Sequence, residues 1–147
     1  MTQRLDYTNV APVKALGGVY GYIAQSNLPA QLVNLIYLRV SQLNGCAYCI
    51  DMHSRDLLKG GLAVERLVLV PVWREASSLF DSRERAALAW AETVTRVDDT
   101  AIPDGEFESA SAAFSEKDLA DLTIAIGLMN AYNRLAIGFR NPPKAAT

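Results

Sequence analysis

Both cysteines of the chain and its only histidine lie in one short segment. Cys46, Cys49 and His53 are separated by three and four residues, which on an α-helix places their side chains along one stripe. A thiolate at a helix N-terminus is stabilised by unpaired N–H groups and by the positive end of the helix dipole. Two cysteines at this spacing can also bridge without moving the backbone. The pattern therefore predicts a redox-active dithiol.

The histidine distinguishes the two cysteines. His53 follows Cys49 by one helical turn and Cys46 by about two, so it is placed to take the proton of Cys49. We therefore predict that Cys49 is the attacking thiolate and Cys46 the resolving partner. We expect an exposed Cys49 that ionises below the free-thiol value of about 8.5, and a Cys46 that ionises near or above it.

Two other interpretations of the segment stay open. Zinc could be held by the two cysteines and His53 with Asp51 or Asp56, but structural zinc sites usually close with a second, distant ligand pair, and the chain has no further cysteine or histidine. The cysteines could also be inert and buried beside a hydrogen-bonded core histidine, which is common for each residue type alone. That second interpretation leaves the joint spacing as coincidence.

Helices are expected to position this segment. The stretch from Ala47 to Lys59 has helical composition and ends at Gly60-Gly61, and a helix opened by Pro29 runs toward Asn44-Gly45 and delivers the chain to the cysteines. Further helices are expected from Pro12 to about Ser26 with Thr8 or Asn9 as cap, from Asp81 or Ser82 with Glu84 in a reciprocal cap, from Asp104 to Phe114, and after Ser115 with Asp118. The periodicity of Leu62–Trp73 fits a short helix or a buried strand, and the helix is favoured because no second strand-like run could pair with it. Val97–Glu106 is expected to be a turn region.

The last apolar run, Leu119 to Phe139, is about long enough to span a bilayer. It contains Asp121 and Arg134 together with two asparagines, which are costly in lipid, so we expect a buried helix of an oligomer and not a transmembrane helix. Pro142-Pro143 is expected to stop it.

Length and composition set the class of protein. The 147 residues suit a single domain over residues 1–147, without a linker to divide it. A net charge of −2 gives no reason to expect nucleic acid or an anionic membrane as partner. The N-terminus lacks the pattern of a signal peptide, so a cytoplasmic location is expected, where such a cysteine pair is more often catalytic than structural. Half the residues are hydrophobic, which suggests that some apolar surface is buried between subunits.

Several stretches together resemble the alkylhydroperoxidase D-like branch of the carboxymuconolactone decarboxylase family, over about Pro12 to Pro143. They are LRVSQLNGCAYCIDMH and the following Gly-Gly, VPVWRE from Val70, ERAALAWAE from Glu84, and NAYNRLAIGFRNPP from Asn130. The resemblance implies an all-α, single-domain helical bundle assembled as a homotrimer or homohexamer, with hydroperoxide reduction as the activity. It also implies an external dithiol reductant, which in the best-studied branch is a lipoyl-bearing adaptor protein.

The resemblance assigns roles residue by residue. Cys49 matches the cysteine that attacks the peroxide, Cys46 the resolving cysteine, and His53 the histidine after the pair. Two positions depart from the pattern: the proton-relay glutamate of the family falls on Asn34, and a histidine that some members have between the cysteines is Tyr48.

The departure at Asn34 shortens the expected proton relay. An asparagine amide can orient His53 or hold a water, but it does not accept a proton near neutral pH. Asp51 points to a different side of its helix from His53, and the sequence cannot place Glu65, Glu75 or Glu84. Tyr48 either brings a hydroxyl near the thiols or packs as a surface aromatic.

The expected chemistry is peroxide reduction through a sulfenic acid on Cys49 and a Cys46–Cys49 disulfide, with no bound metal or organic cofactor. Without the glutamate, the protein is expected to be a slow peroxidase or chiefly a disulfide reductase. Two alternatives remain: a dithiol that only switches the oligomeric state of a structural protein, and a decarboxylase-like or isomerase-like enzyme that uses His53 as acid and base.

Overall fold

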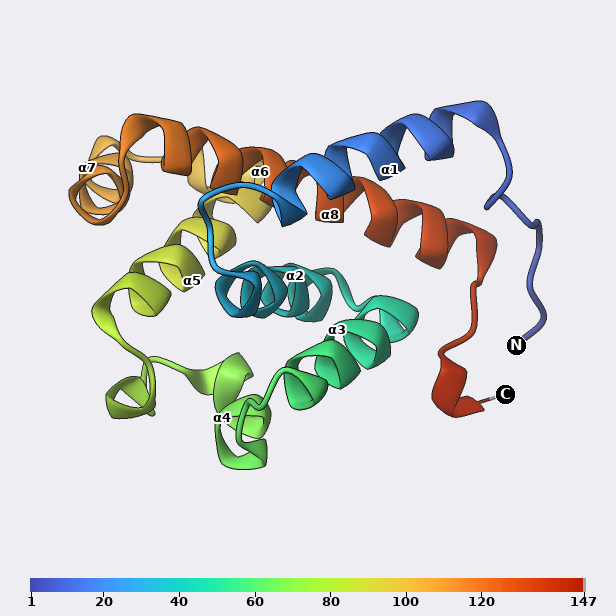
Figure 1. The fold of residues 1–147 in the computed structure, drawn as a ribbon, viewed down its shortest axis with the longest axis horizontal. Coiled ribbons are helices and arrows are strands. Elements are labelled where there is room, and N and C mark those ends of the chain that lie inside the picture. Colours follow the sequence, from blue (N-terminus) through green and yellow to red (C-terminus); the bar gives the residue numbers. More distant parts are fainter. Residues whose placement is uncertain (147) are drawn as a thin grey trace.

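The computed structural model describes residues 1–146, and within them helices are the only regular secondary structure, with no strand (Figure 1). The bounds of the helices are α1 Ala11–Ala24, α2 Ala30–Asn44, α3 Ala47–Lys59, α4 Val64–Leu69, α5 Ser82–Thr95, α6 Val97–Thr100, α7 Asp104–Ala113 and α8 Glu116–Phe139, with 3-10 turns η1 at Val70–Val72, η2 at Ser77–Leu79 and η3 at Lys144–Ala146. The expected all-α class is confirmed.

Helix α2 is the centre of the bundle. Its side chains are buried on most of its circumference, as expected of a helix that is apolar nearly all round. It packs against α3, α5 and α8, and Figure 1 shows α8 and α1 on one side of it and α3 and α4 on the other. The last turn of α2 therefore brings the chain to the cysteines inside the bundle and not at its edge.

Capping residues fix several helix starts. Asp81 and Glu84 form the expected reciprocal capping box on α5, and the Ser115 side chain accepts a hydrogen bond from the Asp118 N–H at the start of α8. The expected cap on α1 is wrong: α1 begins after Val10, which makes no side-chain cap, and the Thr8 hydroxyl donates to Asp6 at 2.7 Å. The expected turn region after Val97 contains the short α6.

The polar residues in the long apolar run connect α8 to α2. Asn133 is fully buried and donates to the Ser41 hydroxyl at 3.0 Å, and the Asn44 amide donates to both Asn130 and Asn133 at 2.9 Å. Buried polar groups are stable only when they are hydrogen-bonded in this way. No helix within residues 1–146 is long and apolar enough to cross a bilayer.

The N-terminal segment folds back over the end of α8. The Arg4 N–H donates to the Phe139 carbonyl at 2.8 Å, and the rings of Tyr7 and Phe139 lie 5.5 Å apart. Both described termini lie at this end of the bundle (Figure 1). Tyr7 is consequently buried, although it precedes the first helix.

Candidate functional site

The cysteine pair begins helix α3. Gly45 has a left-handed backbone (φ 73°), which glycine adopts at little cost, and this turn separates α2 from α3. Cys46 is the N-cap of α3 and forms a disulfide with Cys49, the two Cα atoms lying 5.4 Å apart. The prediction that the two cysteines can bridge at a helix start is confirmed.

In the first turn of α3, the two sulfurs make different contacts. The Cys49 backbone N–H donates to Cys46 Sγ over 3.3 Å. A sulfur at an N-cap takes the place of the oxygen of a capping serine or aspartate, and a negative charge there is favoured by the helix dipole. This contact favours the charged form of Cys46, which is opposite to the order of ionisation that the spacing to His53 predicts.

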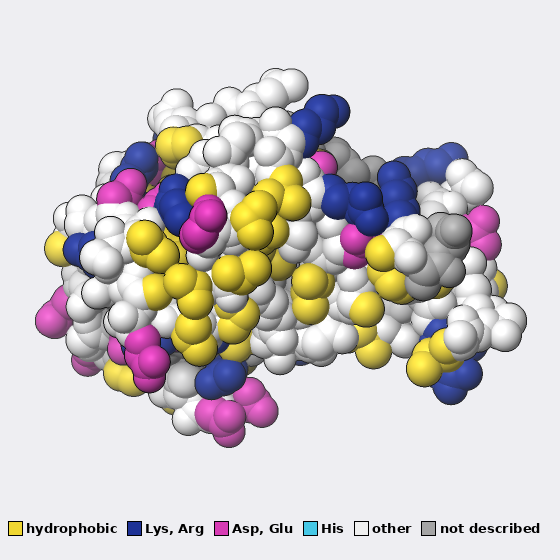
Figure 2. All heavy atoms as spheres, turned by 90° about the horizontal axis from the view of Figure 1, so that it is seen from below, with side chains coloured by type: hydrophobic (Ala, Val, Ile, Leu, Met, Phe, Trp, Pro, Cys, Tyr) yellow, Lys and Arg dark blue, Asp and Glu magenta, His cyan; other side chains and the backbone are white. Residues whose placement is uncertain are grey.

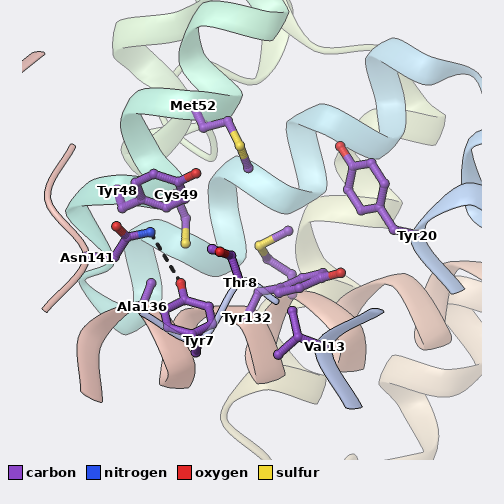
Figure 3. Close-up of a pocket in the computed structure, with 11 residues that line it drawn as sticks. Tyr7, Thr8, Val13, Tyr20, Tyr48, Cys49, Met52, Tyr132, Ala136 and Asn141 are labelled. Atoms are coloured by element: carbon purple, nitrogen blue, oxygen red, sulfur yellow. Dashed lines mark hydrogen bonds between the residues drawn. The ribbon is translucent and has the colours of Figure 1, made fainter. Parts of the chain in front are cut away.

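The expectation of an exposed sulfur is wrong. Cys46 and Cys49 are only 1% and 2% exposed, because the first turn of α3 packs against α2 and α8. Cys49 instead lines a cavity of about 310 Å³ that opens to the surface, and its sulfur points into it between Tyr48 and Tyr7 (Figure 3). A substrate would reach this sulfur through the cavity and not from open solvent.

The cavity is walled by aromatic and thioether side chains from four parts of the chain. Tyr7 comes from the N-terminal segment, Tyr20 from α1, Tyr48 from α3 and Tyr132 from α8. The remaining lining residues are Thr8, Val13, Met52, Met129, Ala136 and Asn141. None of the side chains that line the cavity with Cys49 carries a charge.

Sequence reasoning found Tyr48 but missed the other three tyrosines. They are more than a hundred residues apart at the extremes, and nothing in their local spacing indicates a shared cavity. Tyr48 itself is half-buried and also borders a second hollow of about 360 Å³, which Cys46 and Arg140 line. The prediction that its hydroxyl acts on the thiols stays a prediction.

His53 lies in the core, one helical turn after Cys49 on α3. It is fully buried, and its Nδ1 lies 3.2 Å from the Asn34 amide oxygen. Because that oxygen can only accept, Nδ1 carries the proton, and Nε2 is left as an acceptor. Among the described residues no group hydrogen-bonds to Nε2, and the ring of Tyr37 lies 5.0 Å from the imidazole.

Burial also changes the strength of this base. Removing the imidazole from water disfavours its charged form and lowers the pKa of His53 to about 4. At neutral pH the ring is therefore uncharged, and it can accept a hydrogen bond from a thiol more readily than it can hold the thiol's proton.

The structure brings Asn34 and His53 together, as the family resemblance implied, and it separates the other proposed acids from them. Glu84 is engaged in the capping box and binds Arg66 at 2.6 Å, while Asp51 binds Arg55 at 2.9 Å. Glu65 and Glu75 are exposed on the surface. Asn34 is thus the hydrogen-bond partner of the imidazole.

The zinc interpretation needs three or more ligands in one place. Within the described part of the chain, no three His, Cys, Asp or Glu side chains are arranged to hold a metal ion. Asp51, one of the proposed ligands, is instead paired with Arg55.

Known proteins are similar to this chain in sequence and in fold. The model of the carboxymuconolactone decarboxylase family matches residues 12–93. The uncharacterized protein YdfG of Bacillus subtilis is 34% identical over 143 residues, which cover 96% of this chain and 97% of that protein.

Two solved structures extend the comparison. A protein of unknown function from Agrobacterium tumefaciens, described as a candidate antioxidant defence protein AhpD, is 38% identical with a TM-score of 0.91, covering 97% of this chain and 98% of that one. An uncharacterized peroxidase-related protein from Silicibacter sp. TM1040 is 25% identical with a TM-score of 0.78, covering 94% of this chain and 73% of that one. The chain therefore belongs to the carboxymuconolactone decarboxylase family and, within it, to the alkylhydroperoxidase D-like branch.

Proposed function

We propose that this protein is a thiol-dependent hydroperoxide reductase that uses the Cys46–Cys49 pair. The observation that carries the proposal is a bridged cysteine pair at the start of α3, with Cys49 in the wall of a cavity large enough for an organic substrate. Family membership, the candidate antioxidant defence protein of Agrobacterium tumefaciens and the peroxidase-related protein of Silicibacter support the same reaction class.

Cys49 makes the first attack, because it is the cysteine at the tyrosine-lined cavity. Its thiolate attacks the terminal peroxide oxygen, so that an S–O bond forms, the O–O bond breaks and the alkoxide leaves to take a proton from solvent. The cysteine becomes a sulfenic acid, which is two electrons more oxidised, and the peroxide is reduced to an alcohol or to water.

Cys46 completes the oxidative half of the cycle. Its thiolate attacks the sulfur of the Cys49 sulfenic acid, which forms the S–S bond, breaks the S–O bond and releases water after protonation. The Cys49 N–H that donates to Cys46 Sγ stabilises this thiolate before it reacts.

An external dithiol restores the pair. One of its thiolates attacks Cys49 and expels Cys46 as a thiolate, and its second thiol then attacks the mixed disulfide and releases Cys49. The position of Cys46 at the N-cap makes it the better leaving group of the two. We propose a dithiol protein as the donor, with a lipoyl-bearing adaptor as the first to test, and no bound cofactor.

His53 assists as a neutral hydrogen-bond acceptor. With its pKa lowered to about 4 by burial, the imidazole helps to orient the thiol but withdraws its proton weakly. Asn34 holds the tautomer that leaves Nε2 free to accept. This arrangement predicts a slower peroxidase than one with a carboxylate at position 34.

We also propose that the chain works in the cytoplasm as a homotrimer or homohexamer. Val64 and Val68 of α4 and Val72 of η1 are exposed at intervals of four residues. Figure 2 shows hydrophobic side chains gathered on the face seen from below, the side on which α4 lies in Figure 1. An apolar face of this kind is commonly covered by another subunit. Light scattering measures the mass of the assembly and so distinguishes a monomer, a trimer and a hexamer.

Thiol titration tests the reaction. The protein is reduced, desalted without oxygen and mixed with one equivalent of cumene hydroperoxide, and free thiols are counted in denaturant. We expect the loss of both thiols in the native protein and no loss in Cys49→Ser.

Other outcomes would favour the alternative functions. A thiol count that stays constant while the protein still reduces a small disulfide would indicate a disulfide reductase. Turnover of a lactone acid at constant thiol count would favour the His53-based enzyme. A change of mass on oxidation without peroxide turnover would indicate a redox-switched oligomer.

A further inference from the structure

Cys49 is the one residue in the wall of its cavity that reacts as an anion, and four of the other lining side chains are phenols. Burial raises the pKa of Tyr7, Tyr20 and Tyr132 above the ordinary value, so their hydroxyls stay protonated across the physiological range. No lining side chain other than Cys49 can offer a countercharge. An ionised ligand would lose its hydration there without compensation, which is costly.

The size and lining of the cavity restrict the ligand further. Its volume of about 310 Å³ is at the lower end of the range of roughly 300 to 1,000 Å³ for small-molecule pockets. Tyrosine rings and the thioethers of Met52 and Met129 make favourable contacts with a second aromatic ring. The walls therefore suit a compact, uncharged molecule that carries such a ring.

Tyr7 closes one side of this cavity from outside the helical bundle. Its ring packs on Phe139 at 5.5 Å, its hydroxyl accepts a hydrogen bond from the Asn141 amide at 3.3 Å, and the residue is only 7% exposed. Figure 3 shows Tyr7 facing Cys49 across the cavity. Tyr7 is thus the part of the cavity wall that the N-terminal segment supplies.

We propose that the cavity is a specificity pocket for an uncharged, aryl-bearing organic molecule and that Tyr7 sets this preference. Resting on the proposed function, the preferred substrate is an aryl-substituted hydroperoxide, and its terminal oxygen is presented to Cys49. The oxidation and reduction steps are those given above, and the aryl group takes no part in them.

Binding tests the pocket without relying on catalysis. The Cys46→Ser/Cys49→Ser double variant is titrated with 2-phenylpropan-2-ol, the alcohol that cumene hydroperoxide would yield, and binding is followed by calorimetry and by NMR of the tyrosine rings. We expect it to bind at least about tenfold more tightly than phenylacetate, benzyltrimethylammonium or the ring-free tert-butanol. Equal or tighter binding of any of these three, or no binding of the aryl alcohol, would overturn the proposal.

A Tyr7 series tests the specificity determinant. The ratio of kcat/KM for cumene hydroperoxide to that for tert-butyl hydroperoxide should fall about tenfold in Tyr7→Ala and stay near the native value in Tyr7→Phe, which keeps the ring. Tyr22→Ala, which removes an exposed tyrosine that does not line the cavity, is the matched control. A ratio that Tyr7→Ala leaves unchanged would remove Tyr7 from the proposal.

The two experiments separate this inference from the proposed function. If the native protein consumes no hydroperoxide while the double variant binds the aryl alcohol, and Tyr7→Ala in that background weakens binding, the pocket stands and the peroxidase activity falls. If peroxides are reduced with no preference for an aryl group, the activity stands and the pocket assignment falls.

Discussion

Cys46 and Cys49 are three residues apart in one turn of helix and almost equally buried, yet their surroundings differ. Cys46 is the N-cap and receives a backbone hydrogen bond. Cys49 points into the tyrosine-lined cavity. The helix N-terminus thus stabilises a negative charge on Cys46, which does not line this cavity, while the cavity gives a substrate access to Cys49. The cysteine that ionises more readily therefore need not be the one that meets the substrate.

The largest effect is expected from exchanging the two cysteines for serine. Because Cys49 supplies the attacking sulfur, Cys49→Ser should lower the rate of peroxide consumption at least about a thousandfold. Cys46→Ser should keep the first attack within about tenfold and accumulate a dimedone-reactive sulfenic acid, measured by intact mass. Serine is a good N-cap, so the start of α3 should survive. A sulfenic acid trapped on Cys46 in Cys49→Ser would reverse the assignment.

The next largest effect concerns the base behind Cys49. Since burial lowers the pKa of His53 to about 4, the unfolded chain binds a proton below pH 6.5 that the folded chain does not. The free energy of unfolding should be unaffected by this group above pH 6.5 and should fall by about 3 kcal/mol as the pH decreases through 4. Urea unfolding of the oxidised protein against pH measures the loss.

His53→Gln supplies the control for this pH dependence. The variant lacks the only imidazole of the chain and keeps every carboxyl group, so its loss of stability between pH 6.5 and 4 should be smaller by the same amount. Equal slopes in the native protein and the variant would show that His53 is not the source of the dependence.

Restoring a carboxylate near His53 should sharpen the difference between the cysteines. In Asn34→Glu, a negative charge beside the imidazole favours its protonated form and raises its pKa, which lets it draw the proton from Cys49. We expect thiol loss with cumene hydroperoxide to become about tenfold faster near neutral pH in stopped-flow measurements. Asn34→Gln, which changes length without adding charge, should show no acceleration, and identical rates in the two variants would exclude a relay through position 34.

The smallest effect is the difference in ionisation between the two thiols. The pH at which iodoacetamide alkylation reaches half its maximal rate should be lower for Cys46 in Cys49→Ser than for Cys49 in Cys46→Ser, by about half a unit to one unit. The reverse order would mean that His53 outweighs the helix N-terminus and would restore the prediction made from spacing alone.

The sequence predicted the parts of the fold that depend on local signals. The bounds of α3, the turn at Gly45, the capping box of Asp81 and the start of α8 follow from composition and capping residues within a few positions. The predicted cap of α1 was wrong because Thr8 hydrogen-bonds to Asp6 and the helix begins only after Val10. Local patterns do not show such competition between neighbours.

The site was predicted where one segment or a family match carries it, and missed where tertiary packing does. The spacing of Cys46, Cys49 and His53 was informative, and the match to the family placed Asn34 at the histidine. Burial of the sulfurs, the low pKa of His53 and the wall formed by Tyr7 all depend on elements distant in sequence. The hydrophobic periodicity of a sequence does not show which helices pack around a given turn.

Hydrogen bonds of asparagine and serine side chains connect α2, which leads to the cysteines, to α8, which forms part of the cavity wall. Asn44, immediately before the Gly45 turn, is bonded to Asn130 and Asn133 of the helix that also carries Tyr132 and Ala136 in the cavity wall. A shift of α8 would therefore displace the wall and the cysteine-bearing turn as one unit. Occupancy of the cavity and the oxidation state of the pair are consequently expected to influence each other through the protein framework as well as by direct contact.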